Sequence, residues 1–345
     1  MARLHRTRRA AGAAFLALGL PVLAGCAVFQ PGPPDTPEPV LEVAEPAASA
    51  AAPAPAAAES PTPAPPPERP LPPVTVLHEA ASASHAATAD EVARALGAAG
   101  FAVERLPIDS EPVSAPLALR PGSIAVAVGL AAAERAKRDF DGPVVFCQVF
   151  NHGGLPEPGR PIWGVDSVPP LAAQLRGWKA TDPSLERVAV ILSDAQAALA
   201  ARAVEAGRAL GLEVTHATSG SDNETLYLFR RLAPAVDGLW LLPDNSILSP
   251  RILRELLRYA ASHGVGVLVP NQTLLSWGAL LRASSTRTDV AAKVASVVRR
   301  VARGDTAGLP ALTPLSEVEL EVNARTAAEL ELPARAGVWV LREPD

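Results

Sequence analysis

Short apolar runs alternate with helical patterns from residue 74 onward, and this alternation restricts the fold more than any other feature of the sequence. We interpret the apolar runs as strands, at residues 74–78, 101–106, 123–129, 143–150, 187–193, 212–217, 238–243, 265–270, 279–285 and 318–322. Apolar residues spaced by three and four predict helices at residues 88–99, 130–138, 195–210, 249–263 and 289–303. Nearly continuous apolar strands that alternate with helices predict parallel sheets with both faces covered.

Local signals at the helix ends agree with this prediction. Gly211 and Gly264 stand where a left-handed residue ends a helix, and Ser249-Pro250 offers an N-cap followed by proline at the first helical position. The irregular segment 151–165 interrupts the alternation of strands and helices. We therefore predict an α/β fold of two doubly wound, Rossmann-like parallel-sheet domains joined by a hinge. A single barrel is the alternative.

Polar residues follow several predicted strands at the point where each strand ends. In an open parallel sheet, ligands bind outside the carboxyl ends of the strands. Asp244 offers a carboxylate for a ligand ammonium, and Asn245 offers an amide that bridges polar groups. The candidate ligand contacts are Ser84, His85, Gly129, Ser193, Asp194, Asp244, Asn245, Asn271 and Trp277.

Each of these candidates also has a purely structural interpretation. Asp244 and Asn245 can form a turn at a helix N-terminus, and Ser193 and Asp194 can cap the helix that follows them. Trp277, like Trp163, lies in or beside a predicted crossing between the domains, where a ring either stacks on a planar solute or packs the hinge. Trp240 lies in mid-strand, which favours core packing.

The sequence offers little support for catalysis. His78, Ser84, His85 and Asp244 are the residue types of a nucleophilic triad, but no Gly-x-Ser-x-Gly elbow accompanies them. No residues have the spacing of metal ligands, and no glycine-rich nucleotide loop occurs. Cys147 lies in an apolar run and is typical of a buried cysteine. We therefore expect no enzymatic activity, no metal and no cofactor.

The N-terminus predicts export. Several arginines precede an apolar run at residues 10–25, the pattern of a signal peptide. Leu23-Ala24-Gly25-Cys26 resembles the lipobox of bacterial lipoproteins. That resemblance implies cleavage after residue 25 and acylation of Cys26, with a palmitate-type anchor that faces the periplasm or the exterior. An uncleaved anchor helix is the alternative.

The next segment, residues 26–73, contains the lipidated cysteine and a stretch rich in proline and alanine. Such a stretch cannot form a core, so we expect a disordered tether that reaches on the order of 100 Å. The net charge of −5 and the pI near 5.8 argue against nucleic acid as a partner.

Residues 237–281, DGLWLLPDNSILSPRILRELLRYAASHGVGVLVPNQTLLSWGALL, resemble the core of the ABC-transporter substrate-binding lipoproteins, which include receptors of tryptophan and tyrosine importers. The family shows a strand that ends in a Pro-x-Asp-Asn-like turn, then a helix, a strand and a Gly-Ala dipeptide. The resemblance extends over most of residues 74–332. It implies a type I periplasmic binding protein, in which two α/β lobes close on a small solute.

The resemblance also implies domain boundaries. It places residues 74–150 and 278–303 in the first lobe, 165–269 in the second lobe, and 151–164 and 270–277 in the crossings. The closing strand and helix, residues 304–345, belong to either lobe.

The implied function is capture of an amino-acid-like solute by a monomeric, lipid-anchored receptor, which delivers the solute to an ABC permease and its ATPase. The alternative is an envelope lipoprotein that kept this scaffold as a sensor or an assembly partner.

Overall fold

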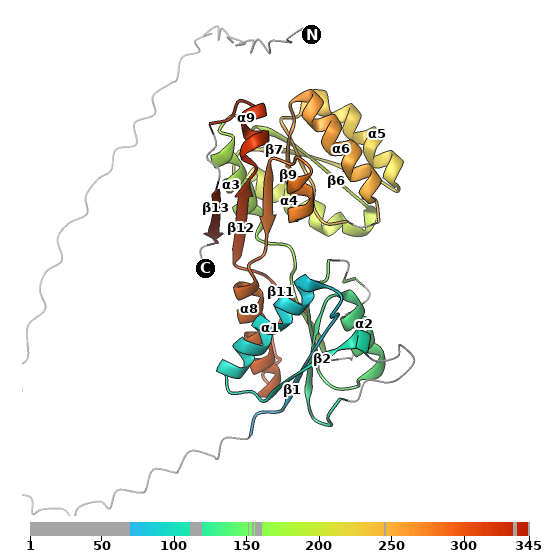
Figure 1. Ribbon diagram of the computed structural model, residues 1–345, viewed down its shortest axis with the longest axis vertical. Helices are drawn as coiled ribbons and strands as arrows, with labels where there is room; N and C mark the ends of the chain where they lie inside the picture. The colour runs from blue at the N-terminus through green and yellow to red at the C-terminus, as the bar shows by residue number, and fades with distance from the viewer. Residues whose placement is uncertain are drawn as a thin grey trace, which may run out of the picture. The chain divides into compact units, whose positions relative to one another are not determined.

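The computed structural model describes residues 70–110, 119–150, 152–153, 155, 161–244, 246–333 and 337–343, and these form two α/β lobes (Figure 1). The predicted signal peptide, Cys26 and nearly all of the predicted tether lie outside the described residues. Within the described part, the chain builds one six-stranded and one seven-stranded sheet. The prediction of two doubly wound, mostly parallel sheets is confirmed.

The first sheet has the strand order β11-β5-β4-β3-β1-β2, and its neighbouring strands are parallel. Its strands are β1 (Val74–His78), β2 (Val103–Pro107), β3 (Ile124–Val128), β4 (Val144–Cys147), β5 (Ile162–Val165) and β11 (Leu312–Thr313). Alternate residues of β3 face opposite sides. Ile124 and Val126 pack in a cluster with α1 (Ala83–Ala98) and α8 (Arg287–Ala302), whereas Ala125 and Ala127 pack with α2 (Leu130–Asp139). A short 3-10 helix, Ile108–Ser110, follows β2.

The second sheet has the order β13-β12-β10-β9-β8-β6-β7, with antiparallel pairing of β10 with β12 and of β12 with β13. Its strands are β6 (Arg187–Leu192), β7 (Glu213–Thr218), β8 (Gly238–Trp240), β9 (Gly266–Val269), β10 (Leu281–Ser284), β12 (Glu317–Val322) and β13 (Gly337–Arg342). One face is covered by α3 (Leu171–Thr181), α4 (Ala197–Arg208) and α9 (Ala324–Glu329). The other is covered by α5 (Asp222–Leu232), α6 (Pro250–His263) and α7 (Gln272–Ser276). Two 3-10 helices, Asp194–Gln196 and Ala233–Ala235, complete this lobe.

The predicted helix signals of α6 are confirmed. The Ser249 side chain accepts a hydrogen bond from the Ile252 amide, Pro250 occupies the first helical position, and Gly264 ends the helix with φ of 64°. The buried residues of α6 repeat at helical spacing, at Ile252, Leu256 and Ala260. They pack against the sheet of the second lobe, as expected for the apolar face of a surface helix.

Three predicted assignments are wrong. Residues 278–284 were assigned to the first lobe, but β10 pairs with β9 and β12 in the second sheet, because Leu281 and Ala283 bury their side chains in that lobe's core. Residues 162–164 were assigned to a crossing, but β5 pairs with β4 in the first sheet. The segment 270–277 is not a crossing either, since α7 packs on the second lobe.

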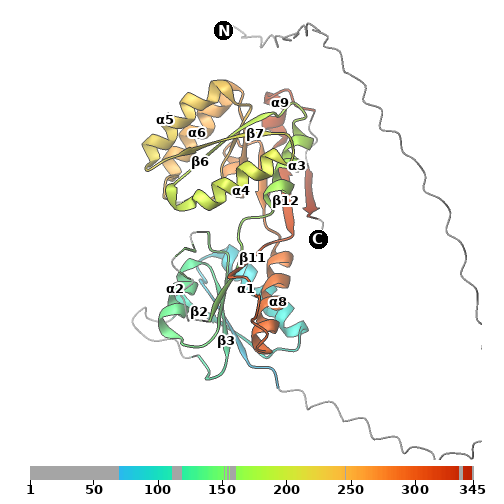
Figure 2. The ribbon, with the colours of Figure 1, turned by 180° about the vertical axis from the view of Figure 1, so that it is seen from behind.

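The chain passes between the two sheets three times in the part that the structure describes. Residues 166–170 connect β5 to α3, residues 285–286 connect β10 to α8, and residues 314–316 connect β11 to β12. Figure 2 shows the same region from behind. There α8 and β11 lie in the first lobe, and the chain continues from β11 into β12 of the second lobe. The strand at 318–322, whose lobe the sequence left open, belongs to the second sheet.

Trp178 of α3 is fully buried and packs directly over the backbone of two strands. A Cβ on Gly238 would lie 2.4 Å from the Trp178 ring, and a Cβ on Gly266 would lie 3.7 Å from it. The indole therefore fits only because β8 carries no side chain at residue 238.

We predict that Gly238→Ala lowers the free energy of unfolding by about 1–3 kcal/mol, because the added methyl group overpacks the core against Trp178. Gly97→Ala is the matched control, since Gly97 is exposed on α1 and a Cβ there has nothing within 4 Å. The control is expected to be neutral or to stabilise by up to about 1 kcal/mol. Urea unfolding followed by tryptophan fluorescence measures both. Equal stability of the two variants would contradict this packing.

Candidate functional site

A cleft of about 1040 Å³ lies between the two lobes and beside the crossings. The first lobe contributes residues of α1, of the loop after β4 and of the start of α8, and the second contributes strand ends and the outer strands β10, β12 and β13. The described residues that line it include Ser84, His85, Thr88, Glu91, Gln148, Phe150, Ser167, Val168, Gln174, Pro243, Pro270, Asn271, Gln272, Arg282, Ser284, Ser285, Thr286, Arg287, Thr288, Glu317, Glu319, Val340 and Arg342.

The N-terminus of α1 brings hydroxyl and imidazole groups into the cleft. Ser82 caps the helix by accepting a hydrogen bond from the His85 amide at 3.3 Å, and the His85 Nδ1 lies 3.1 Å from the Glu79 carboxylate. The ring of His85 sits against Gly129, where a Cβ would lie 2.5 Å from it. Gly129 also has φ of 90°, so both the backbone and the neighbouring ring require glycine here.

The loop after β4 contributes a strained residue. Gln148 has φ of 57°, in the left-handed region that non-glycine residues rarely adopt. Its Nε2 donates a hydrogen bond to the Ser285 hydroxyl of a crossing at 3.4 Å. Two residues later, Phe150 lines the cleft with 38% of its surface exposed. Such strain concentrates at functional sites, and the exposed ring gives the cleft an apolar element.

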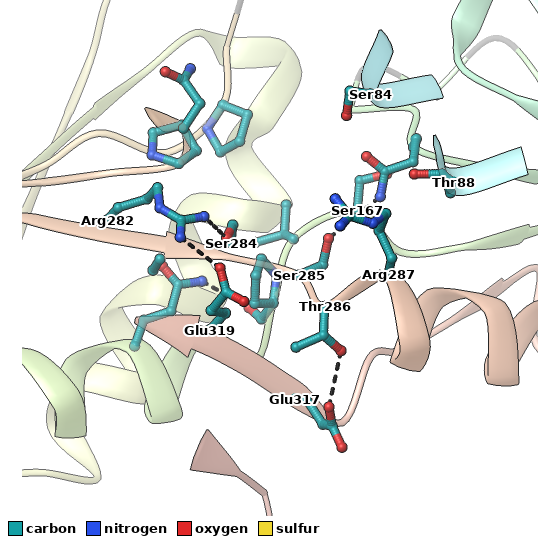
Figure 3. Close-up of a pocket in the computed structure, with 18 of the residues that line it drawn as sticks. Ser84, Thr88, Ser167, Arg282, Ser284, Ser285, Thr286, Arg287, Glu317 and Glu319 are labelled. Atoms are coloured by element: carbon teal, nitrogen blue, oxygen red, sulfur yellow. Dashed lines mark hydrogen bonds and ion pairs between the residues drawn. The ribbon is translucent and has the colours of Figure 1, made fainter. Parts of the chain in front are cut away.

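The outer strands of the second sheet form a charged wall. Arg282 Nη2 lies 2.6 Å from Glu319 and 2.8 Å from Glu321, and its Nη1 donates to Ser284. Figure 3 shows Arg282, Ser284 and Glu319 pointing toward one another, on the paired strands β10 and β12. Because the single charge of Arg282 is shared by two carboxylates, this part of the wall keeps an excess of negative charge.

Two buried carboxylates hold the crossings. Asp166 accepts from the Val168 amide at 2.9 Å and lies 3.4 Å from Arg202 of α4. Asp289, at the start of α8, accepts from the Ser316 and Glu317 amides at 2.7 and 3.0 Å. Both side chains therefore fix segments where the chain leaves one lobe for the other.

The structure brings three of the predicted ligand contacts to the cleft. Ser84, His85 and Asn271 line it, although the Asn271 side chain also caps α7 by accepting from the Leu274 amide at 3.0 Å. Gly129 lies behind His85 and supports it. Asn245 lies outside the described residues.

Asp244 does not line the cleft, and its predicted role as a direct ligand contact is wrong for this structure. The side chain is 2% exposed and accepts hydrogen bonds from the Ser193 amide at 2.8 Å and from the Ser246 amide at 3.1 Å and hydroxyl at 2.5 Å. Burial alone would raise the pKa of Asp244, but the hydrogen bonds from Ser193 and Ser246 outweigh it and lower the pKa below 3.8. The structural interpretation as a turn is the correct one.

The remaining predicted contacts also lie away from the cleft. Ser193 gives its backbone amide to Asp244, and Asp194 is exposed at the start of a 3-10 helix. Trp277 packs on the second lobe beneath the guanidinium of Arg254, 4.3 Å from the ring centre. Trp240 is buried, and its Nε1 donates to Gln174 at 3.1 Å, as core packing requires.

The sequence did not identify Gln148, Phe150 or the charged residues of β10, β12 and α8. The available signal was the crossing itself: once residues 281–284 are assigned to the second sheet, the polar run Ser284-Ser285-Thr286-Arg287-Thr288 falls between the lobes. The charged residues of β12 alternate with apolar ones, which is typical of a strand with one exposed face.

The residue types of the hypothetical triad are not assembled. His85 faces Glu79, and Asp244 is held by Ser193 and Ser246. Burial, followed by the charge of Arg105, lowers the pKa of His78. Burial also raises the pKa of Cys147 to about 12. The described residues contain no cluster of three or more metal-ligating side chains. None of their helices is long and apolar enough to cross a membrane.

Comparisons with known proteins show which solved structures share this fold. No protein-family model matches the chain, and no curated protein matches it. The ABC domain from Streptococcus pneumonia in complex with L-Trp has a TM-score of 0.52 at 16% identity, over 76% of this chain and 95% of that one. CD0873 from Clostridium difficile, described as a ligand-free, open substrate-binding protein with adhesive properties, has a TM-score of 0.54 at 15% identity, over 77% and 96%.

A conserved domain protein from Vibrio cholerae gives a TM-score of 0.51 at 16% identity, over 77% of this chain and 96% of that one. At these identities the likeness shows the fold alone. The chain therefore has the two-lobed fold of type I periplasmic binding proteins.

We predict that Asp244→Asn lowers the free energy of unfolding by about 1–3 kcal/mol at pH 7, because the amide cannot accept from all the donors that surround the carboxylate. The folded-state pKa of Asp244 is depressed, so its contribution is present above the unfolded value and is lost as the pH falls through the folded value. The difference from wild type should therefore shrink below about pH 4. Asp194→Asn, at an exposed position, is the control and should match wild type throughout. Thermal unfolding between pH 3 and pH 7 measures the differences, and a gap that is as wide at pH 3 as at pH 7 would contradict the argument.

Proposed function

We propose that the protein is a solute receptor that captures a small molecule in the interlobe cleft by closure of the lobes and carries out no chemistry. The observation that carries this proposal is the cleft itself, which is lined by both lobes and by two of the three crossings that connect them, residues 166–170 and 285–286. Its walls combine hydroxyl groups, an exposed ring and charged side chains, the mixture that small-molecule sites use for affinity and orientation.

The crossings are suited to closure about a hinge. Two of them, residues 285–286 and 314–316, are only a few residues long, and hinges consist of a few residues at the ends of elements. The Asp289 carboxylate holds the second of these segments to α8, so α8 and this crossing form one firm unit. The loop after β4 is connected to the crossing at residues 285–286 by one side-chain hydrogen bond, from Gln148 to Ser285 at 3.4 Å. Closure of the lobes can break this bond at low cost in free energy.

We further propose that the receptor is anchored by lipid at Cys26, faces the periplasm or the exterior, and serves an ABC permease and its ATPase as a monomer. The lipobox-like sequence before Cys26 and the tether composition support the anchor. The resemblance of residues 237–281 to importer receptors supports delivery to a permease and an amino-acid-like solute. One of the proteins with this fold was solved with L-Trp.

The binding proposal predicts two coupled changes in the full chain. A solute at a hundredfold excess over its Kd stabilises the folded form by about 2.7 kcal/mol, which corresponds to a rise in Tm of roughly 5–10 °C. Closure should also lower the radius of gyration in small-angle scattering. A screen of amino acids, carboxylic acids, nucleosides and sugars by thermal shift, followed by scattering on each hit, measures both. Absence of any hit would favour a role as a sensor or assembly partner, and a hit without compaction would contradict closure.

The anchoring proposal predicts that Cys26→Ser abolishes incorporation of labelled palmitate and releases the protein from the membrane fraction. Cys147→Ser is the matched control, because Cys147 is fully buried and its pKa is raised to about 12, so its thiol is not available for acylation. The control should incorporate label as wild type does. Label that persists in Cys26→Ser would locate the lipid elsewhere or show that the N-terminus is an uncleaved anchor.

A further inference from the structure

The carboxylates that line the cleft are all paired in the part of the chain that the structure describes. Glu91 pairs with Arg94 on α1, Glu317 lies 2.7 Å from Arg342, and Glu319 lies 2.6 Å from Arg282. Glu317 also accepts from the Thr286 hydroxyl at 2.9 Å. Each of these three carboxylates is therefore already engaged by an arginine, although Glu319 shares Arg282 with Glu321.

Arg287 differs from the other arginines of the cleft. Its side chain is exposed, it lines the cleft, and it forms no hydrogen bond or ion pair with the described residues. Figure 3 shows it on the same side of the cleft as Ser84, Thr88 and Ser167, apart from the ionic cluster of Arg282 and Glu319. The cleft therefore presents one unpaired positive charge from its described residues, beside several hydroxyl groups.

The position of Arg287 on its helix makes this charge unfavourable in the empty protein. It is the first residue of α8, directly after the N-cap Thr286, where the positive end of the helix dipole disfavours a cation. The nearest acidic residue of the same turn, Asp289, uses a carboxylate oxygen to accept from the Ser316 and Glu317 amides. Arginine at this place breaks the local rule for helix termini, and such violations are expected at functional sites.

We propose that Arg287 binds the carboxylate of the solute, and that the preferred ligand is a small monocarboxylate with an apolar body rather than a zwitterion. This inference rests on the proposed receptor function, but it replaces the amino-acid-like solute that the resemblance implies with an acid that lacks the ammonium group. An arginine holds a carboxylate through two parallel N–H···O bonds, and the bound anion removes the unpaired charge from the helix terminus. The exposed ring of Phe150, which also lines the cleft from the first lobe, offers contact for the apolar body.

The ion pairs of the cleft also disfavour two other classes of ligand, ammonium compounds and dianions. An ammonium group that enters the cleft loses water and needs a carboxylate, but Glu91, Glu317 and Glu319 are already engaged by arginines, and Asp244 is buried elsewhere. A dianion such as phosphate brings a second negative charge close to these three carboxylates, where like charges repel. A single negative charge matches a single unpaired Arg287.

Two matched sets of compounds test the inference by calorimetric titration of the full chain. The first set is 3-phenylpropionate, L-phenylalanine and 3-phenylpropanamide; the second is 4-methylpentanoate, L-leucine and 4-methylpentanamide. Each set keeps one skeleton and changes only the charged groups. Inorganic phosphate and glucose serve as the dianion and the neutral polyol. We expect the acid of at least one set to bind at least tenfold more tightly than its amino acid and its amide.

Two variants test whether Arg287 causes the preference for the acid. Arg287→Gln should weaken binding of the acid by tenfold or more and should raise the Tm of the unliganded protein by about 1 °C, because a charge is removed from the wrong end of the helix. Arg299→Gln is the matched control, because Arg299 is exposed in the last turn of the same helix and has no role in the cleft. It should leave binding unchanged and should lower the Tm slightly, since a cation is favourable there.

The outcomes separate this inference from the receptor function. Tighter binding of the amino acid than of the acid, or binding of phosphate or glucose that survives Arg287→Gln, would overturn the carboxylate inference and leave the receptor function intact. A complete absence of binding by all these compounds would count against both. A Tm for unliganded Arg287→Gln below that of wild type would show that Arg287 stabilises the empty protein, which contradicts the argument from the helix terminus.

Discussion

The arrangement of the site depends on three passages of the chain between two sheets. Each passage must satisfy the hydrogen-bonding groups of residues that belong to neither sheet, and buried carboxylates do this at two of them: Asp166 at residues 166–170 and Asp289 at residues 314–316. An unpaired backbone amide in such a place costs about as much as a lost hydrogen bond. With these segments fixed, the ends of β4, β8 and β9 and the outer strands β10 and β12 lie around one cleft.

The two lobes supply the lining of the cleft in different ways. In the first lobe, the loop after β4 and the first turns of α1 supply the lining, as expected at the carboxyl ends of parallel strands. In the second lobe, the antiparallel addition of β12 and β13 extends the sheet beyond β10, and charged residues on these strands form the wall. The second contribution does not follow from the general rule for parallel sheets. It depends on where the chain re-enters the second sheet after α8.

Much of the fold could be predicted from the sequence, because strands such as residues 187–192 are apolar throughout and helices such as α6 carry regular apolar spacing. The helix α3 was missed because it is buried on almost every side and shows no clear helical period. The strand β13 was missed although it is an apolar run that alternates exposed and half-buried residues. The boundary near residue 278 was wrong because the partner strand of β10, at residues 317–322, is distant in sequence.

Polar residues at strand ends serve two purposes, and the sequence does not separate them. Asp244 and Asn271 both follow apolar strands, but the Asp244 carboxylate is consumed by Ser193 and Ser246, whereas Asn271 caps a helix and still lines the cleft. A turn residue whose acceptors are all occupied contributes only stability. A binding residue differs because its fold leaves a charge or a hydrogen-bond donor without a partner. Arg287 has this property. Its helix, α8, begins at a crossing, and no neighbouring described strand supplies a carboxylate to Arg287 there.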